Sequence, residues 1–158
     1  MVSEPHSVES ATYESANRML PVSVNPSAAI LVVDDDEFVL EIVRYLLVHA
    51  GFTVLTAQNG EEALNLILDK GREIRLLLSD VVMPDSFDGF ELAERVRKHR
   101  PDLPVLLMTG AALHDYPSAY LAAWEPMILR KPFSPDRLLT FVRENIEAAN
   151  RLIYPAVP

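Results

Sequence analysis

Residues 30–37 of the chain read ILVVDDDE, an apolar run followed directly by acidic residues. A short run that is apolar at every position is typical of a strand buried on both faces of a parallel sheet. Carboxylates that follow such a strand lie at its carboxyl end, the edge where open parallel sheets bind ligands. This stretch therefore predicts both a buried parallel strand and a functional edge of the sheet.

Further short apolar runs alternate with amphipathic stretches, which is the pattern of βα units around a parallel sheet. We predict buried strands at 30–33, 76–78, 105–108 and 127–129, and an edge strand of mixed polarity at 53–57. The fold class predicted is α/β. Its expected architecture is a three-layer α/β/α sandwich on a five-stranded parallel sheet of order 2-1-3-4-5, the flavodoxin-like order.

Capping residues mark the ends of the predicted helices. Asp36 caps the first helix, which ends before Gly51. Its predicted inner face consists of Val39, Ile42, Val43 and Leu46. The fourth helix is placed within 112–123, where Pro117 is expected to interrupt it. The other helices start at the pairs Asn59 with Glu62, Asp88 with Glu91, and Ser134 with Pro135.

Composition limits the kind of protein. A length of 158 residues suits one domain with a proper core, and 49% hydrophobic with 23% charged residues is ordinary for a globular protein. We expect a flexible leader at 1–27 with a short helix near 13–20, one domain at 28–150, and a tail at 151–158.

Charge and cysteine content exclude several classes of function. A net charge of −9 argues against binding of nucleic acid through its phosphates. No apolar run approaches the roughly 18 residues of a membrane-spanning helix, and no secretory signal is recognisable. The chain has no cysteine, which excludes disulfides and thiolate metal sites. We therefore expect a cytoplasmic protein without membrane or nucleic-acid contacts.

Polar residues stand at the ends of four predicted strands, at Asp34–Asp36, Asp80, Thr109 and Lys131. The carboxyl ends of parallel strands share one edge, so these side chains should converge. Carboxylates held close together repel one another, and a hard cation such as Mg²⁺ relieves that repulsion through oxygen ligands. A metal-bound carboxylate that faces a lysine and a hydroxyl is arranged to accept a phosphoryl group.

Four motifs extend over residues 28–146 in order: ILVVDDDE, LLLSDVVMPDSFDGFEL, VLLMTG and LRKPFSPDRL. Together they resemble the receiver domains of two-component response regulators, including the chemotaxis-regulator type. The resemblance implies that Asp80 is the phosphoacceptor and that Thr109 and Lys131 contact the phosphoryl group. It also implies Mg²⁺ ligation by Asp35 directly, by Asp34 mainly through water, by Asp80, and by the backbone carbonyl of Val82, with a cis peptide bond between Lys131 and Pro132.

The implied function is a signalling switch, not an enzyme that acts on a separate substrate. A sensor histidine kinase or a phosphotransfer protein would phosphorylate it in a Mg²⁺-dependent reaction, and it would act on an unknown downstream protein. Its own chemistry would be limited to self-phosphorylation and autodephosphorylation.

Three departures from the family pattern concern the face through which the domain would signal. Ile128 stands where the family often has an aromatic residue. The loop Met83–Gly89 is one residue longer than the shortest pattern, which would let Phe87 bulge out beside the pocket. Residues 124–126 replace a glycine-containing turn. We therefore expect output to involve reordering of residues 111–126, with the Met83–Gly89 loop as the alternative.

Two other functions are weighed against this one. A phosphatase of the haloacid-dehalogenase kind needs a second acidic pair late in the chain, but only the isolated Asp136, Glu144 and Glu147 follow Lys131. A pseudo-receiver that docks proteins without being phosphorylated stays possible because of the unusual strand-five region. Tyr120 and Trp124 are either packing residues or a recognition patch, with packing favoured. The histidines His6, His49, His99 and His114 lack metal-ligand spacing.

Overall fold

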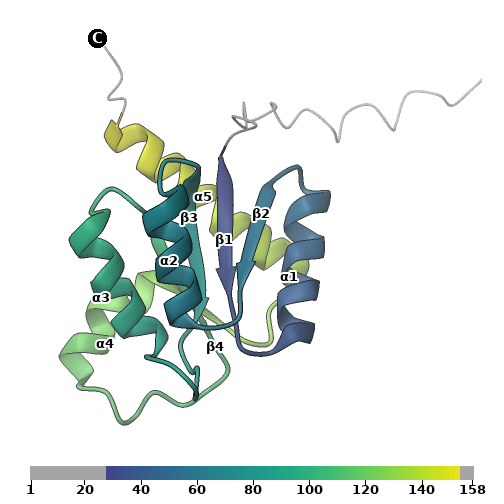
Figure 1. Ribbon diagram of the computed structural model, residues 1–158. Coiled ribbons are helices and arrows are strands. Elements are labelled where there is room, and N and C mark those ends of the chain that lie inside the picture. Colours follow the sequence, from purple (N-terminus) through teal and green to yellow (C-terminus); the bar gives the residue numbers. More distant parts are fainter. Residues whose placement is uncertain (1–27, 154–158) are drawn as a thin grey trace, which may run out of the picture.

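Strands and helices alternate along residues 28–153, the part of the chain that the computed structural model describes (Figure 1). The strands are β1 (Ala29–Val33), β2 (Thr53–Ala57), β3 (Ile74–Asp80), β4 (Val105–Thr109) and β5 (Ile128–Arg130). The helices are α1 (Glu37–His49), α2 (Gly60–Lys70), α3 (Gly89–His99), α4 (Ser118–Trp124), the 3-10 helix η1 (Glu125–Met127) and α5 (Pro135–Ile153). The predicted leader at 1–27, which includes His6, and residues 154–158 of the predicted tail lie outside the described residues.

The strands form one parallel sheet in the order β2-β1-β3-β4-β5, which confirms the predicted flavodoxin-like topology. In the register of the sheet, Asp80 lies opposite Met108 and Thr109 lies opposite Arg130. In this strand order, β1 lies beside β3, and β4 lies between β3 and β5. This order brings the carboxyl ends of β1, β3, β4 and β5 to one edge of the sheet.

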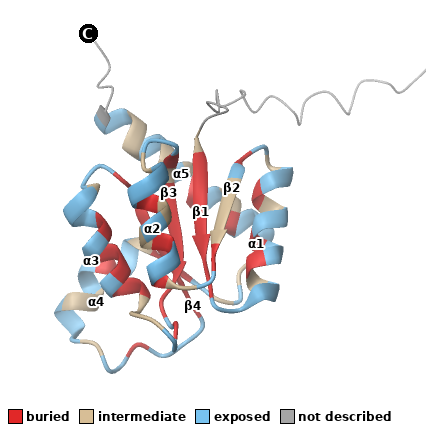
Figure 2. Ribbon diagram, in the orientation of Figure 1, coloured by how far each residue is buried: buried red, intermediate tan, exposed pale blue. Residues whose placement is uncertain are grey.

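The sheet is covered by helices on both faces, and its interior strand β1 is buried along its whole length (Figure 2). Leu31 and Val33 of β1 pack in a cluster with side chains of α2, α3 and α4. Ile30 and Val32 pack in a second cluster with side chains of α1 and α5. Because successive residues of a strand point to opposite faces, burial on both faces requires an unbroken apolar run.

The face that helix α1 presents to the sheet differs in part from the one predicted. Its fully buried side chains are those of Leu40, Val43 and Leu47. Of the predicted inner face, Val43 is confirmed as buried, Val39 and Leu46 are partly buried and pack against the core, and Ile42 is 59% exposed. The helix is apolar around most of its circumference, so the sequence pattern did not distinguish the face that packing selects.

The predicted capping residues begin the helices. Backbone N–H groups in the first turns of α1, α2, α3 and α5 donate at 2.8–3.2 Å to the side-chain oxygens of Asp36, Asn59, Asp88 and Ser134. Gly51 follows α1 with a φ of 92°, a conformation that favours glycine. In a capping box the glutamate side chain also accepts from the backbone N–H of the cap residue, and this second bond is not formed here. Glu62 instead accepts from the backbone N–H of Gln58 at 2.8 Å, and Glu91 binds Arg95.

Helix α4 begins after Pro117 and is not interrupted by it. A proline is tolerated at the start of a helix, where its missing N–H is not needed. The strand β5 begins at Ile128, one residue later than predicted, because Met127 ends η1. Helix α5 continues past residue 150 to Ile153. Within residues 28–153, no helix combines the length and apolar character that crossing a lipid bilayer requires.

Candidate functional site

Polar side chains from four strands meet at the carboxyl edge of the sheet. Asp34 directly follows β1, Asp80 ends β3, Thr109 ends β4, and Lys131 directly follows β5. The ammonium group of Lys131 donates to Asp34 Oδ2 at 2.8 Å and to Asp80 Oδ1 at 3.0 Å. The predicted Lys131 thus joins two of the other predicted site residues, Asp34 and Asp80.

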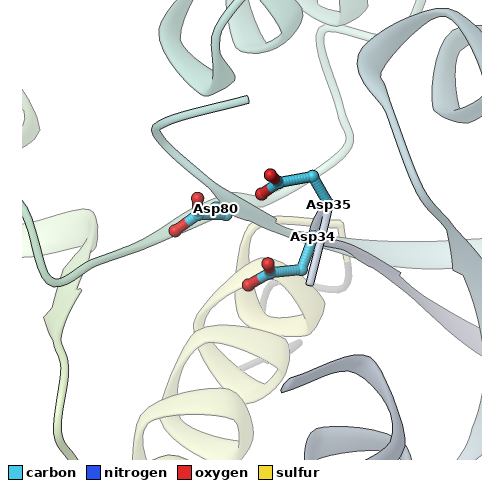
Figure 3. A group of neighbouring side chains, drawn as sticks. All are labelled: Asp34, Asp35 and Asp80. Carbon is cyan, nitrogen blue, oxygen red and sulfur yellow. The ribbon is translucent and has the colours of Figure 1, made fainter. Parts of the chain in front are cut away.

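The carboxylates of Asp34, Asp35 and Asp80 form an acidic cluster at the ends of β1 and β3 (Figure 3). One oxygen from each lies within 4.8 Å of the others. Asp34 is 1% exposed and Asp80 is 7% exposed, whereas Asp35 is exposed to solvent. The cluster therefore has a buried side, closed by Lys131, and an open side at Asp35.

Asp34 is held in place by both of its carboxylate oxygens. Oδ1 accepts a hydrogen bond from the backbone N–H of Asp36 at 3.0 Å, and Oδ2 accepts from Lys131 at 2.8 Å. The side chain of Asp36 itself turns away to cap α1. The three consecutive aspartates therefore occupy three distinct environments.

Burial dominates the electrostatics of Asp80. Desolvation raises the pKa of its carboxyl group above the usual value, Lys131 acts in the opposite direction, and the nearby charges of Asp34 and Asp35 add to the rise. For Lys131, burial lowers the pKa, but its hydrogen bond to Asp34 and the charge of Asp80 together raise it. Lys131 therefore stays charged, while ionisation of Asp80 is opposed by its surroundings.

The donor set fits a hard divalent cation. Asp34, Asp35 and Asp80 offer only oxygen atoms, which Mg²⁺ prefers, and Mg²⁺ usually keeps several waters. The exposure of Asp35 gives such waters access to the cluster. A cation held here would also offset the repulsion from Asp34 and Asp35, which adds to the effect of burial on the pKa of Asp80.

Thr109 lies beside this cluster at the end of β4 and is 1% exposed. Its Oγ1 accepts a hydrogen bond from the backbone N–H of Ala111 at 3.1 Å. The hydroxyl group of Ser79, the residue before Asp80, donates to the backbone carbonyl of Asp80 at 2.9 Å. The backbone around the cluster is thus fixed by side-chain hydroxyls.

The loop between β3 and α3 folds back onto the protein, so the expectation that Phe87 bulges out is wrong. Phe87 is half-buried against Gly60, and the guanidinium carbon of Arg95 lies 4.3 Å from its ring centroid. A Cβ atom on Gly89 would come within 2.2 Å of the backbone oxygen of Asp80. The start of α3 can therefore approach Asp80 only with a glycine at this position.

The family model of the response regulator receiver domain matches residues 30–143 of the chain. The chain belongs to this family. As a receiver domain, it is a module of two-component signalling proteins, and its five-stranded sheet has the topology that such domains share.

Several relatives are similar to this receiver domain. Response regulator MprA of Mycobacterium sp. (strain KMS) is 40% identical over 72% of this chain and 48% of that protein. Sensor kinase CckA of Brucella abortus is 36% identical over 77% of this chain and 13% of that protein. The solved structure of a CheY-like receiver domain protein from Methanospirillum hungatei is 31% identical, with a TM-score of 0.70 over 79% of this chain and 98% of that one. The chain thus spans less than half the length of MprA and of CckA.

The residues around β5 include both expected and unusual features of the family pattern. Ile128 is buried, and the peptide bond between Lys131 and Pro132 is cis, as the resemblance implied. Trp124 is 4% exposed and lies 5.8 Å, ring centroid to ring centroid, from Phe90. Packing, rather than an exposed recognition patch, is therefore the role of Trp124.

Sequence reasoning missed one contact beside the site. The hydroxyl group of Tyr116 donates to Asp88 Oδ2 at 2.6 Å, which ties the segment before α4 to the start of α3. The sequence pattern identifies Asp88 as a helix cap, but no local pattern predicts its hydrogen bond to Tyr116. Within the described residues, His49, His99 and His114 are exposed and lie outside the acidic cluster.

Proposed function

We propose that this receiver domain is a Mg²⁺-dependent switch that accepts a phosphoryl group on Asp80. The observation that carries the proposal is the single lysine that binds both Asp34 and Asp80 next to a cluster of three carboxylates. This arrangement supports the proposal because the Asp80 carboxylate lies beside the Lys131 ammonium group and two further carboxylates at one edge of the sheet.

In the proposed reaction a carboxylate oxygen of Asp80 attacks the phosphorus of a phosphohistidine or of a small phosphodonor. A phosphorus–oxygen bond forms as the bond to the leaving group breaks. Lys131, already 3.0 Å from Asp80 Oδ1, neutralises charge on the phosphoryl oxygens. Thr109 turns its hydroxyl group from the backbone toward one of these oxygens. Autodephosphorylation, in which water attacks the same phosphorus, would reset the switch.

The proposed metal ligands are Asp35 directly, Asp34 mainly through water, Asp80, and the backbone carbonyl of Val82. Bound Mg²⁺ would supply positive charge that stabilises the transferring phosphoryl group. Asp35 supports this assignment because it is the exposed member of the cluster. Asp34 is already engaged by Lys131 and by the backbone, which suits a ligand that acts through water.

We further propose that the phosphodonor is a sensor histidine kinase or a phosphotransfer protein in the cytoplasm. Helix α1, which starts beside the acidic cluster, exposes Phe38 (83%), Ile42 (59%) and Tyr45 (60%). An exposed apolar face next to a reactive site suits a docking protein. Output is proposed to reach an unidentified protein by direct contact, because the net charge of −9 disfavours nucleic acid.

Phosphorylation with acetyl phosphate and Mg²⁺ tests the proposal. Intact-mass measurement should show one added phosphoryl group that is stable in acid and lost in base, and chelation of Mg²⁺ should prevent its addition. Asp80→Asn should take up none, while the matched variant Asp85→Asn, which changes a nearby exposed acid, should behave like the parent protein. Full labelling of Asp80→Asn would refute the assignment. A parent protein that stays unmodified would instead favour the pseudo-receiver scaffold.

A further inference from the structure

Helix α4 has few of the features that stabilise a helix by itself. It is seven residues long, its N-cap Pro117 provides no side-chain hydrogen bond, and Trp124 is its only fully buried residue. Aromatic rings make further contacts with α3: the ring of Tyr116, just before the helix, and that of Tyr120 lie 4.8 and 5.3 Å from that of Phe90, centroid to centroid. Such an element belongs to the low-stability part of a fold and is easily displaced.

Two tyrosine hydroxyls fasten this segment to α3. Tyr116 donates to Asp88 Oδ2 at 2.6 Å, and Tyr120 donates to Glu94 Oε1 at 2.9 Å. Asp88 uses its other oxygen to cap α3 at the backbone N–H of Glu91. Burial and the hydrogen bond to Asp88 raise the pKa of Tyr116, so its hydroxyl group remains a donor at neutral pH.

Each partner of the Tyr116–Asp88 bond is connected by a short loop to a residue of the pocket. Asp88 follows Asp80 through the β3–α3 loop, and Tyr116 follows Thr109 through the β4–α4 loop. The second loop is tied to the pocket directly, because the backbone N–H of Ala111 donates to Thr109 Oγ1 at 3.1 Å. A rotation of the Thr109 hydroxyl therefore removes an acceptor from the loop that carries Tyr116.

We propose that the Tyr116–Asp88 hydrogen bond is a latch that holds α4 against α3 until Asp80 is phosphorylated. This inference rests on the proposed function. When Thr109 turns to a phosphoryl oxygen, Ala111 loses its acceptor, the loop shifts, and Tyr116 leaves Asp88. Ile128 has no aromatic ring that could rotate in β5. Release of the latch would take the place of such a rotation. The moving element is then α4 itself, whose far end carries Trp124.

Tyr116→Phe tests the latch, with Tyr120→Phe as the matched control. Both variants keep the ring that packs on Phe90 and lose one hydroxyl group. The full chain is titrated with beryllofluoride in the presence of Mg²⁺, and binding is followed by Trp124 fluorescence, since Trp124 is the sole tryptophan. Hydrogen exchange of residues 110–124 is measured with and without this phosphoryl mimic.

Because coupling between sites is reciprocal, loss of a bond that opposes the switched state should tighten binding of the mimic. We expect Tyr116→Phe to bind it roughly fivefold more tightly than the parent protein, the effect of one ordinary hydrogen bond. Its residues 110–118 should exchange, without the mimic, about as fast as those of the parent protein with the mimic. Tyr120→Phe should change the affinity less than Tyr116→Phe does, because the Tyr120–Glu94 hydrogen bond is exposed to water whereas the Tyr116–Asp88 bond is partly buried.

Other outcomes separate the two proposals. If the parent protein binds beryllofluoride and Asp80→Asn does not, while Tyr116→Phe and Tyr120→Phe have equal affinities, the latch is refuted and the proposed function stands. Unchanged exchange in residues 110–118 with changes confined to the Met83–Gly89 loop also refutes the latch. A parent protein that does not bind the mimic refutes the proposed function and the latch with it.

Discussion

At the scale of single residues, the three consecutive aspartates Asp34–Asp36 have different environments and different roles. Asp34 is buried and bound to Lys131, Asp35 is exposed within the acidic cluster, and Asp36 caps α1. The turn after β1 points each carboxylate in a different direction. Metal binding and helix stability should therefore respond to different members of the run.

We predict that Asp35→Asn weakens Mg²⁺ binding about tenfold or more, because a charge is removed from the cluster, with little change in the free energy of unfolding. Asp36→Ala should do the reverse: the lost cap lowers the free energy of unfolding by about 1 kcal/mol while Mg²⁺ affinity is kept. Urea unfolding and Mg²⁺ titrations followed by amide shifts measure both quantities. An equal loss of Mg²⁺ affinity in the two variants would contradict the assignment.

At the scale of elements, the start of α3 is pressed against the end of β3. The backbone N–H of Gly89 donates to the carbonyl of Val81 at 2.8 Å, and a Cβ atom on Gly89 would overlap the carbonyl oxygen of Asp80. The position of the proposed phosphoacceptor thus depends on the close approach of a helix. A Cβ atom on Gly110, which directly follows β4, would meet only Lys131 Cβ, at an ordinary contact distance of 3.5 Å.

Gly89→Ala should therefore lower the free energy of unfolding by about 1 to 3 kcal/mol, the usual cost of overpacking, and slow phosphorylation of Asp80. Gly110→Ala is the control, since the added methyl group has room; its effect should stay within about 0.5 kcal/mol. Denaturant unfolding and acetyl phosphate labelling provide the comparison. Equal stability of the two variants would mean that α3 can move away from β3 without cost.

At the scale of the whole molecule, the pocket affects the stability of the fold as pH changes. The folded protein raises the pKa of Asp80 above its unfolded value of about 3.9. The fold therefore favours the protonated carboxyl group. The resulting stabilisation is present below about pH 3.9 and is lost as pH rises through the raised folded pKa.

We predict that, without Mg²⁺, Asp80→Asn is more stable than the parent protein at neutral pH, and that this difference shrinks in acid. Addition of Mg²⁺ should stabilise the parent protein, because a ligand that binds the folded state shifts the equilibrium toward it, and should stabilise Asp80→Asn less. Thermal unfolding across pH, with Asp85→Asn as a control, measures this. A less stable Asp80→Asn at neutral pH would show that the ion pair with Lys131 outweighs burial.

The sequence by itself determined the sheet, its strand order and the residues that meet at its edge. Strands covered on both faces must be apolar at every position, and the polar residues that follow them stand out, as Asp34, Asp80 and Lys131 do. Helix caps at Asp36, Asn59 and Asp88 were readable because a cap and its helix are adjacent in the chain. These features depend on local order along the chain.

Only the tertiary structure decided which face of α1 is buried, where α4 begins, and that Tyr116 binds Asp88. Helix α1 is apolar on most sides, so the shape of the sheet surface selects Leu40, Val43 and Leu47. Tyr116 and Asp88 belong to separate loops, and their distance depends on how α3 and α4 pack. The raised pKa of Asp80 likewise arises from burial by many side chains, and no local sequence pattern encodes that burial.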